Sequence, residues 1–403
     1  MKRLLPFAFA MLVLSLLPAA GSMAQDAGMS APSTAFEAPA APAPPAIKAR
    51  AAVMIDASDG QVLFSLNPDE RLAMASTTKM MTALLIVENH RDEMDRILTC
   101  STRAAEVGES SIWLTEGEKL TLREMLTGLL VQSGNDAAIT LAEFHAGSVE
   151  AFAERMNERA VELGMENTRF ANPHGLDEEG HYSSATDLVK LGREVMKHPE
   201  IREIVKMEDV LIPWAGHPHG RTLVNHNHLL GLDPSINGIK TGFTDAAGQC
   251  IVISASEGGT DLIVAYLGGP NISQRDEDVL NLIRFGFDSY REMTVINDGV
   301  EYASVDLPYY SGRKLALVSD GSLTRKLFLG NKVERRLILP DKMQLPIHKG
   351  DKIGLVEAYE GNRYLGSTWL VAMEEVAAPS LKEQVSYYVA TIFTFLFSVL
   401  GSG

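Results

Sequence analysis

Three short strings in this 403-residue chain carry the groups that acyl transfer at a serine requires. In chain order they are Ser76-Thr77-Thr78-Lys79, Ser133-Gly134-Asn135 and Lys240-Thr241-Gly242. A serine hydroxyl is a weak nucleophile until a neighbouring base takes its proton, so a serine close to an amine is the pair this chemistry needs. Each string alone is common, but the ordered set S-x-x-K, S-x-N and K-T-G predicts a serine active site.

The first string places Ser76 and Lys79 at the start of a predicted helix over 76–87. The helix is apolar on nearly all faces, which is typical of a buried helix, and its free N–H groups favour a developing oxyanion. Positions i and i+3 share one face, and burial lowers the pKa of a lysine, so Lys79 is a candidate general base for Ser76. The alternative is a helix-capping serine with a solvated lysine.

The second string lies between two predicted helices. The first begins at the capping-box pattern Thr121–Glu124, and the second runs from 136 to about 145. On a tight loop, Ser133 could pass a proton to a leaving amine while Asn135 holds Lys79 or a substrate carbonyl. The alternative is that Asn135 only caps the following helix.

The third string follows Ile236-Asn237-Gly238-Ile239 and reads as part of a predicted strand that begins at Ile236. The charge of Lys240 and the hydroxyl of Thr241 suit a substrate carboxylate. Gly242 has no side chain, so a ligand can approach the strand edge closely. The alternative is an ordinary exposed lysine before a turn.

The surrounding pattern is strands, then helices, then strands. It predicts an α/β (α+β) domain over 49–291 in which both chain ends contribute to one antiparallel sheet covered by helices. The expected strands are 51–55, 62–64, 236–240, 249–256 and 261–267, and the further helices are 149–163, 185–196 and 276–290. Short alternating runs at 314–318, 335–339, 352–357 and 367–372 predict a small all-β domain over 292–376.

Both ends of the chain have a distinct composition. Residues 1–24 read as a secretory signal peptide, with a basic start, an apolar run and a small-x-small site at Ser22-Met23-Ala24. Residues 25–48 are rich in Ala and Pro and predict an extended linker.

The tail over 377–403 has no charged residue from Gln384 to Leu400. Its polar side chains recur on one helical face, at Gln384, Tyr387, Thr391, Thr394 and Ser398. We therefore expect an amphipathic helix that lies on a membrane surface. A short spanning helix and a helix docked on the protein's own core are the alternatives.

Charge and cysteine content narrow the functional classes. A net charge of −16 argues against a nucleic-acid partner.

Cys100 and Cys250 could form one bridge, but a small buried thiol in an apolar strand is the favoured interpretation of Cys250. The pairs His217/His219 and His226/His228 lie among Gly, Pro and Asn that predict loops, and no Cys or carboxylate completes a zinc site nearby, so we expect no metal and no cofactor.

Because it carries the S-x-x-K, S-x-N and K-T-G strings in this order, the chain resembles the D-alanyl-D-alanine carboxypeptidases of the low-molecular-mass penicillin-binding proteins, peptidase family S11. The strings Asn172-Pro173-His174-Gly175-Leu176 and Tyr182-Ser183-Ser184-Ala185 add to this resemblance. It implies a serine β-lactamase/DD-peptidase-like fold, a β-rich second domain and a C-terminal membrane anchor. It also implies an exported enzyme on the periplasmic face of the cytoplasmic membrane. Its expected partners are peptidoglycan pentapeptide stems and β-lactam inhibitors.

The resemblance also implies roles for single residues. Ser76 is the expected nucleophile, Lys79 the base for acylation, and Ser133 with Lys240 the route of the proton to the departing D-alanine. The N–H groups of Ser76 and Phe243 would hold the oxyanion, and Thr241 and Arg275 the terminal carboxylate. Phe243 stands where this group often has a histidine, a difference that bears on substrate preference and deacylation rate.

Other functions use related machinery. A class A β-lactamase carries a Glu-x-x-Leu-Asn loop that positions the deacylating water, and no such string occurs between Ser133 and Lys240. A DD-endopeptidase uses the same site. A protein that only binds peptidoglycan is the alternative from another class, and the intact Ser76/Lys79 pair argues against it.

Overall fold

The computed structural model describes residues 36, 37 and 39–400. The predicted signal peptide over 1–24 and the last three residues of the tail lie outside the described residues. The chain forms two compact units. The large unit is Ala40–Arg291, and the small unit comprises, of the described residues, 292–400 together with 36, 37 and 39.

A five-stranded antiparallel sheet forms the centre of the large unit, in the order β3-β2-β10-β9-β8. Two strands come from the start of the unit and three from its end, which confirms the predicted fold class. The strands are β2 (Ala51–Asp56), β3 (Val62–Leu66), β8 (Ile236–Thr244), β9 (Gly248–Glu257) and β10 (Thr260–Gly269). Strand β8, which carries Lys240-Thr241-Gly242, is an edge strand.

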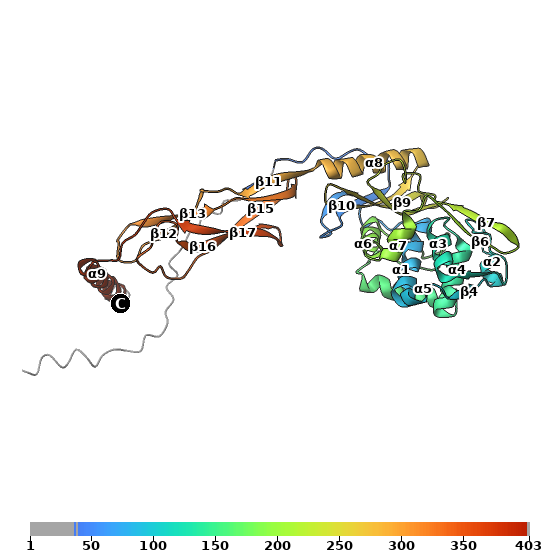
Figure 1. Ribbon diagram of the computed structural model, residues 1–403, viewed down its shortest axis with the longest axis horizontal. Helices are drawn as coiled ribbons and strands as arrows, with labels where there is room; N and C mark the ends of the chain where they lie inside the picture. The colour runs from blue at the N-terminus through green and yellow to red at the C-terminus, as the bar shows by residue number, and fades with distance from the viewer. Residues whose placement is uncertain (1–35, 38, 401–403) are drawn as a thin grey trace, which may run out of the picture. The chain divides into compact units, whose positions relative to one another are not determined.

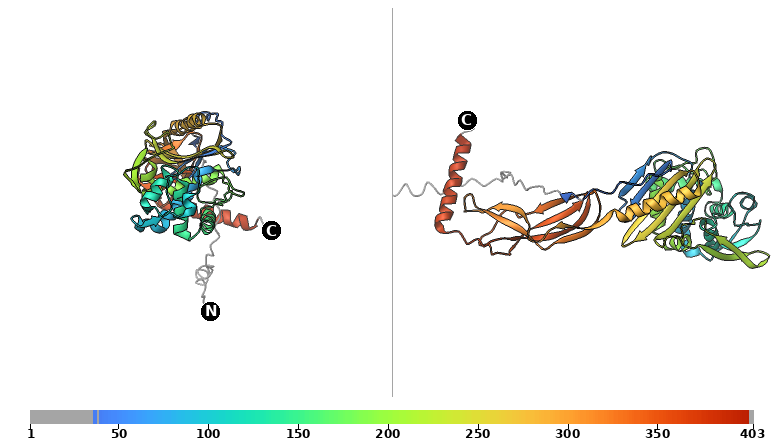
Figure 2. Two further views of the ribbon diagram at one scale, coloured as in Figure 1. Left: turned by 90° about the vertical axis from the view of Figure 1, so that its right-hand side faces the viewer. Right: turned by 90° about the horizontal axis from the view of Figure 1, so that it is seen from above.

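Helices cover both faces of this sheet (Figures 1 and 2). Helix α6 (Ala185–Val195) packs on one face, where Gly192 lies against Val252 and Ile263. Helix α8 (Ile272–Asp288) packs on the other face, where Gly286 lies against Leu262 and Met54. At both positions the missing side chain lets helix and sheet approach closely.

Helix α1, which packs against α6, and the helices beside α1 hold the first two motifs. Helix α1 is buried from Lys79 to Val87, as its all-round apolar pattern predicts. Helix α3 begins with the predicted capping box, in which Thr121 and Glu124 bond each other's backbone N–H groups. The helical segments here are η1 (Ala75–Thr78), α1 (Lys79–His90), η2 (Arg91–Glu93), α2 (Thr102–Ala105), α3 (Leu122–Leu130), α4 (Asn135–Ala146), α5 (Val149–Glu162) and α7 (Pro199–Val205). The short strands β4 (Ile97–Thr99) and β5 (Lys119–Thr121) pair beside them.

The sequence pattern was wrong for the segment that carries His217 and His219. His217 and His219 lie in a hairpin of β6 (Asp209–Trp214) and β7 (His217–Val224), where loop was expected. Gly216, with φ of 77°, makes the tight turn. Pro213 and Pro218 fit because a two-stranded hairpin has outer edges that need no ladder donor.

The two cysteines are both free and buried, so no bridge joins Cys100 and Cys250. Helix α8 begins at Ile272, four residues before the expected start, because the Asn271 side chain accepts a hydrogen bond from Gln274 N (2.9 Å) and caps it there.

The small unit is an antiparallel β-structure with its own apolar core, as predicted. Its main sheet has the order β1-β15-β16-β17-β13-β12, and β11 pairs with β14. The strands are β1 (Phe36–Glu37), β11 (Tyr290–Ile296), β12 (Glu301–Asp306), β13 (Lys314–Asp320), β14 (Leu323–Phe328), β15 (Lys332–Ile338), β16 (Lys352–Glu360) and β17 (Arg363–Ala372). Strand β1 lies within the predicted linker and pairs with β15.

The tail forms helix α9 (Leu381–Leu400). Large apolar side chains on this helix are exposed, including Val385, Ile392 and Phe393. Their exposure argues against the alternative of a helix docked on the protein's own core. Tyr309 of the small unit meets Tyr387 with ring centroids 4.9 Å apart. Within the described residues, none of the helices combines the length and apolar character needed to cross a bilayer.

Candidate active site

Ser76 lies in η1, the single 3-10 turn that leads into α1. Side chains at i and i+3 eclipse in a 3-10 turn, so Ser76 and Lys79 still share a face although the α-helix begins only at Lys79. The turn starts at Ala75, whose φ of 49° is unusual for a residue with a side chain. Its carbonyl accepts a hydrogen bond from Thr78 Oγ1 (2.8 Å).

A buried histidine supports this turn. Ala171 N donates to His181 Nδ1 (3.0 Å), so the ring proton is on Nε2, which donates to Thr78 Oγ1 (2.8 Å). Burial lowers the pKa of His181 to about 4, which keeps the ring neutral for this arrangement. The chain of bonds from His181 through Thr78 to Ala75 therefore fixes the backbone around Ser76.

Lys79 is completely buried and has three oxygen partners. Its Nζ lies 2.7 Å from Ser76 Oγ, 2.8 Å from Asn135 Oδ1 and 2.7 Å from the His174 carbonyl oxygen. Burial holds the pKa of Lys79 well below its usual value, and the charge of Lys240 lowers it further, while Asp136 opposes the shift. A lysine with a lowered pKa and a hydroxyl within hydrogen-bond distance is chemically suited to take the serine proton.

The Ser133-Gly134-Asn135 string turns the chain into α4. Ser133 is buried and has a φ of 63°, so its side chain is held on a tight left-handed turn. Asn135 is the first residue of α4 and does not cap it, because Gly134 occupies the cap position. The Asn135 side chain instead joins Lys79 to the loop over 108–114, where Nδ2 donates to the Gly108 carbonyl (3.0 Å).

Strand β8 lies directly against η1. A Cβ added to Gly242 would lie 2.8 Å from Ser76 N and 2.9 Å from Ala75 Cβ, so only glycine fits there. Lys240 is buried, and burial together with the charge of Arg275 lowers its pKa to about 7. The sequence assigned Gly242 to close approach of a ligand, and the structure adds a close approach of the η1 backbone that the sequence did not signal.

Most of the predicted residues line one pocket of about 300 Å³, namely Ser76, Ser133, Thr241, Gly242, Phe243 and Arg275. Lys79, Asn135 and Lys240 do not line it, and they are buried next to residues that do. Arg275 reaches it from α8 and bonds Asp276 and Gln249, while Phe243 is 58% exposed at its mouth. The lining residues are Ser76, Glu109, Ser110, Ser133, His226, His228, Thr241, Gly242, Phe243, Gln249, Ile272 and Arg275.

Several lining residues were not predicted. Glu109 and Ser110 reach the pocket through a tertiary contact, in which Asn135 N donates to the Ser110 carbonyl (2.7 Å), and nothing local in the sequence signals it. His226 and His228 were considered only as a weak metal pair. Burial, followed by the charge of Lys240, lowers the pKa of His226 to about 4.

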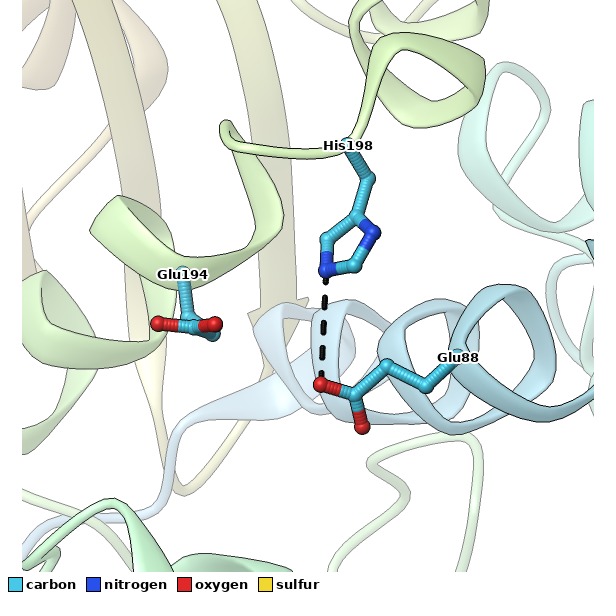
Figure 3. Close-up of side chains that lie close together, drawn as sticks. All are labelled: Glu88, Glu194 and His198. Carbon is cyan, nitrogen blue, oxygen red and sulfur yellow. Dashed lines mark ion pairs between the residues drawn. The ribbon is translucent and has the colours of Figure 1, made fainter.

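A separate group of potential metal ligands shares no residue with the lining of this pocket. Figure 3 shows Glu88 of α1, Glu194 of α6 and His198 before α7. His198 Nε2 is 4.0 Å from Glu88 Oε1, but Arg159 Nη2 lies 2.6 Å from the same oxygen and 3.8 Å from Glu194 Oε1. The two carboxylates thus already share a guanidinium, and we assign no metal to this group.

The antiparallel sheet with helices on both faces, the half-buried serine in contact with a buried lysine and the Lys-Thr-Gly edge strand together define a serine hydrolase of the penicillin-binding type. Comparison with known proteins agrees. The family model described as D-alanyl-D-alanine carboxypeptidase matches residues 38–271, and that of the penicillin-binding protein 5 C-terminal domain matches residues 290–378.

Individual relatives match along most of their length. D-alanyl-D-alanine carboxypeptidase DacF of Bacillus subtilis is 35% identical over 336 residues, which cover 82% of this chain and 86% of the relative. DacD of Escherichia coli is 30% identical over 363 residues, covering 87% and 92%. The crystal structure of penicillin-binding protein 5 from Haemophilus influenzae has a TM-score of 0.62 at 29% identity, covering 84% of this chain and 100% of that chain.

The chain therefore belongs to the D-alanyl-D-alanine carboxypeptidase family. It is an enzyme, a serine-type carboxypeptidase of the hydrolase class, and the family acts on the cell wall.

Proposed function

We propose that this protein removes the terminal D-alanine from peptidoglycan pentapeptide stems through an acyl-enzyme formed on Ser76. The observation that carries the proposal is the fully buried Lys79 amine, 2.7 Å from Ser76 Oγ at the edge of the pocket. A nucleophile and a base in contact, with the base oriented by Asn135 and the His174 carbonyl, form the arrangement that covalent catalysis requires.

Acylation proceeds by attack of Ser76 Oγ on the carbonyl carbon between the two terminal D-alanines. Neutral Lys79 takes the hydroxyl proton, and the C–N bond breaks as Ser133 and Lys240 pass a proton to the departing amine. The N–H groups of Ser76 and Phe243 hold the oxyanion, a role supported by the close packing of Gly242 on Ser76 N. Water then cleaves the ester and restores Ser76.

Cationic and hydroxyl groups in the pocket account for recognition of a free carboxylate at the end of the stem. Thr241 and Arg275 line the pocket and bind that carboxylate. Lys240 is buried next to the lining residue Thr241 and contributes positive charge. A β-lactam presents a carboxylate beside a strained amide, so it acylates the same serine.

The direct test is intact-protein mass spectrometry after exposure to penicillin, together with release of D-alanine from a synthetic pentapeptide. One penicillin mass should be added per chain, and free D-alanine should accumulate with multiple turnovers. Stoichiometric acylation without D-alanine release would identify a penicillin-binding protein that lacks this activity. Absence of both would reject the proposed function.

Activity should depend on the ionisation of Lys240. The pKa of Lys240 is lowered to about 7, so the amine loses its charge as pH rises through that value. Since the proposed role needs the cation, kcat/KM for the pentapeptide should fall above about pH 7. Arg275→Gln removes a positive charge near Lys240 and raises its pKa, so the alkaline limb should move to higher pH even though carboxylate binding weakens. An alkaline limb that stays in place would contradict this role.

We further propose that the protein lies at the periplasmic face of the cytoplasmic membrane, held by α9 as a peripheral anchor. Support comes from four exposed apolar side chains that recur on one face of the helix, Val385, Val389, Ile392 and Phe393. Such a face binds the boundary between lipid headgroups and acyl chains.

Deletion of residues 380–403 should release the mature protein from the membrane fraction, because it removes this apolar face. Fractionation followed by labelling with fluorescent penicillin measures both the location and the integrity of the pocket. A matched variant replaces Val389 and Ile392 with serine, which keeps the helix length and should also release the protein. Continued sedimentation of the deleted chain with membranes would remove α9 as the anchor.

A further inference from the structure

Aromatic rings gather on the surface beside the catalytic pocket. Trp113 is 50% exposed, and its ring centroid lies 6.4 Å from that of the partly exposed Trp214 in β6. Trp214 in turn stacks on exposed His217 of β7, with centroids 4.0 Å apart and planes 20° apart. We call Trp113, Trp214 and His217 the ring platform. Contiguous exposed apolar surface on a soluble protein often marks a site where a ligand or partner binds.

The backbone holds Trp113 in this position at a conformational cost. Its φ is 59°, a left-handed value that is an outlier for a bulky residue. The Asp136 carboxylate fixes the chain on both sides, since Oδ2 accepts from Ile112 N (3.1 Å) and Leu114 N (3.0 Å). Strain held in place by a buried carboxylate is typical of functional positions.

The hairpin that carries Trp214 is tied to the same loop. Buried Arg221 of β7 donates to the Ile112 carbonyl, forms a buried ion pair with Glu118, and places its guanidinium 5.4 Å from the Trp214 ring centroid. The two parts of the ring platform are thus held together by contacts beneath the surface.

We propose that the ring platform binds the glycan to which the stem peptide is attached, so that the enzyme reads the sugar as well as the peptide end. The inference rests on the proposed function and names a second part of the same substrate. Pyranose rings present C–H faces that pack on aromatic rings, while their hydroxyl groups remain in water, which suits half-exposed tryptophans.

The distances are compatible with one substrate spanning both places. Four residues of a pentapeptide stem separate the scissile bond from the sugar, and they span at most about 14 Å when extended. Ser110 lines the pocket, and Trp113 is three residues further on, at most about 11 Å away along the chain. These lengths allow the sugar to reach the platform when the peptide end occupies the pocket. This continuity with the pocket favours the glycan over an unrelated protein partner.

The test compares D-alanine release from a free pentapeptide with release from the same pentapeptide carried on its N-acetylated disaccharide. For the wild-type full chain, kcat/KM should be about three- to tenfold higher for the disaccharide substrate. Trp113→Gly is the best variant, because glycine adopts a φ of 59° without strain and the ring alone is lost. Its preference should fall to about one, while Trp113→Phe should retain most of it.

Matched controls separate the possible outcomes. Trp369 is 43% exposed in the small unit, and Trp369→Ala should leave the preference unchanged. Release from both substrates at equal kcat/KM in the wild type, or a preference that survives Trp113→Gly and Trp214→Ala, would overturn the glycan assignment and leave the carboxypeptidase intact. Release from neither substrate would instead reject the proposed function on which the inference rests.

Discussion

Replacing Ser76 with alanine is expected to abolish both penicillin acylation and D-alanine release. The hydroxyl is the only proposed nucleophile, and loss of a nucleophile lowers turnover by roughly 10⁴-fold or more. Alanine is smaller than serine and Ser76 lies at the pocket wall, so the fold should be kept. Intact mass after penicillin and D-alanine release from a pentapeptide measure the two effects independently.

The matched control is Ser65→Ala, at an exposed position in β3 of the same sheet. It should acylate and turn over like the wild type, with an unchanged melting temperature. D-alanine release at a comparable rate by the Ser76→Ala protein would show that another group attacks the peptide, and the nucleophile assignment would be withdrawn.

The site's residue types could be predicted from sequence because the chemistry limits them. A serine, a lysine three residues later and a Lys-Thr-Gly strand can be recognised in the sequence, because each supplies a group that few other residues can supply. The elements that carry them were also predictable. Helix α1 is apolar on all faces because it is buried, and α3 starts where its capping box lies.

Tertiary contacts set the limit of that prediction. The carbonyl of His174 holds Lys79, and the carbonyl of Ser110 holds Asn135, and a backbone carbonyl carries no residue-specific signal. Gly242 illustrates the same point, because its requirement comes from Ser76 N at 2.8 Å, a neighbour distant in the chain. Local sequence pattern cannot reveal which segments will pack at such distances.

The β6–β7 hairpin was missed for a different reason. Its outer residues are exposed, so the alternation of apolar and polar residues that identifies a half-buried strand is weak. Its prolines and glycine also favour loop by local preference. What fixes it in place is the buried pair of Arg221 and Glu118, a long-range interaction between side chains that usually lie on the surface.

Lys79→Ala is expected to slow acylation by about 10²- to 10⁴-fold, the range in which loss of a general base falls. The variant removes the amine that contacts Ser76 Oγ and leaves Asn135 Oδ1 and the His174 carbonyl without this donor, so the melting temperature should also fall. Stopped-flow acylation by a chromogenic penicillin gives the rate, and circular dichroism gives the melting temperature.

Lys79→Met separates the loss of the base from the loss of packing, because methionine fills the same buried space without an amine. Its acylation should be as slow as that of Lys79→Ala, while more stability is kept. The exposed Lys119→Ala is the control for loss of a lysine elsewhere and should acylate normally. Near-normal acylation in the folded Lys79→Met protein would rule out Lys79 as the base. It would leave Lys240, with its pKa lowered to about 7, as the neighbouring buried amine able to take the proton.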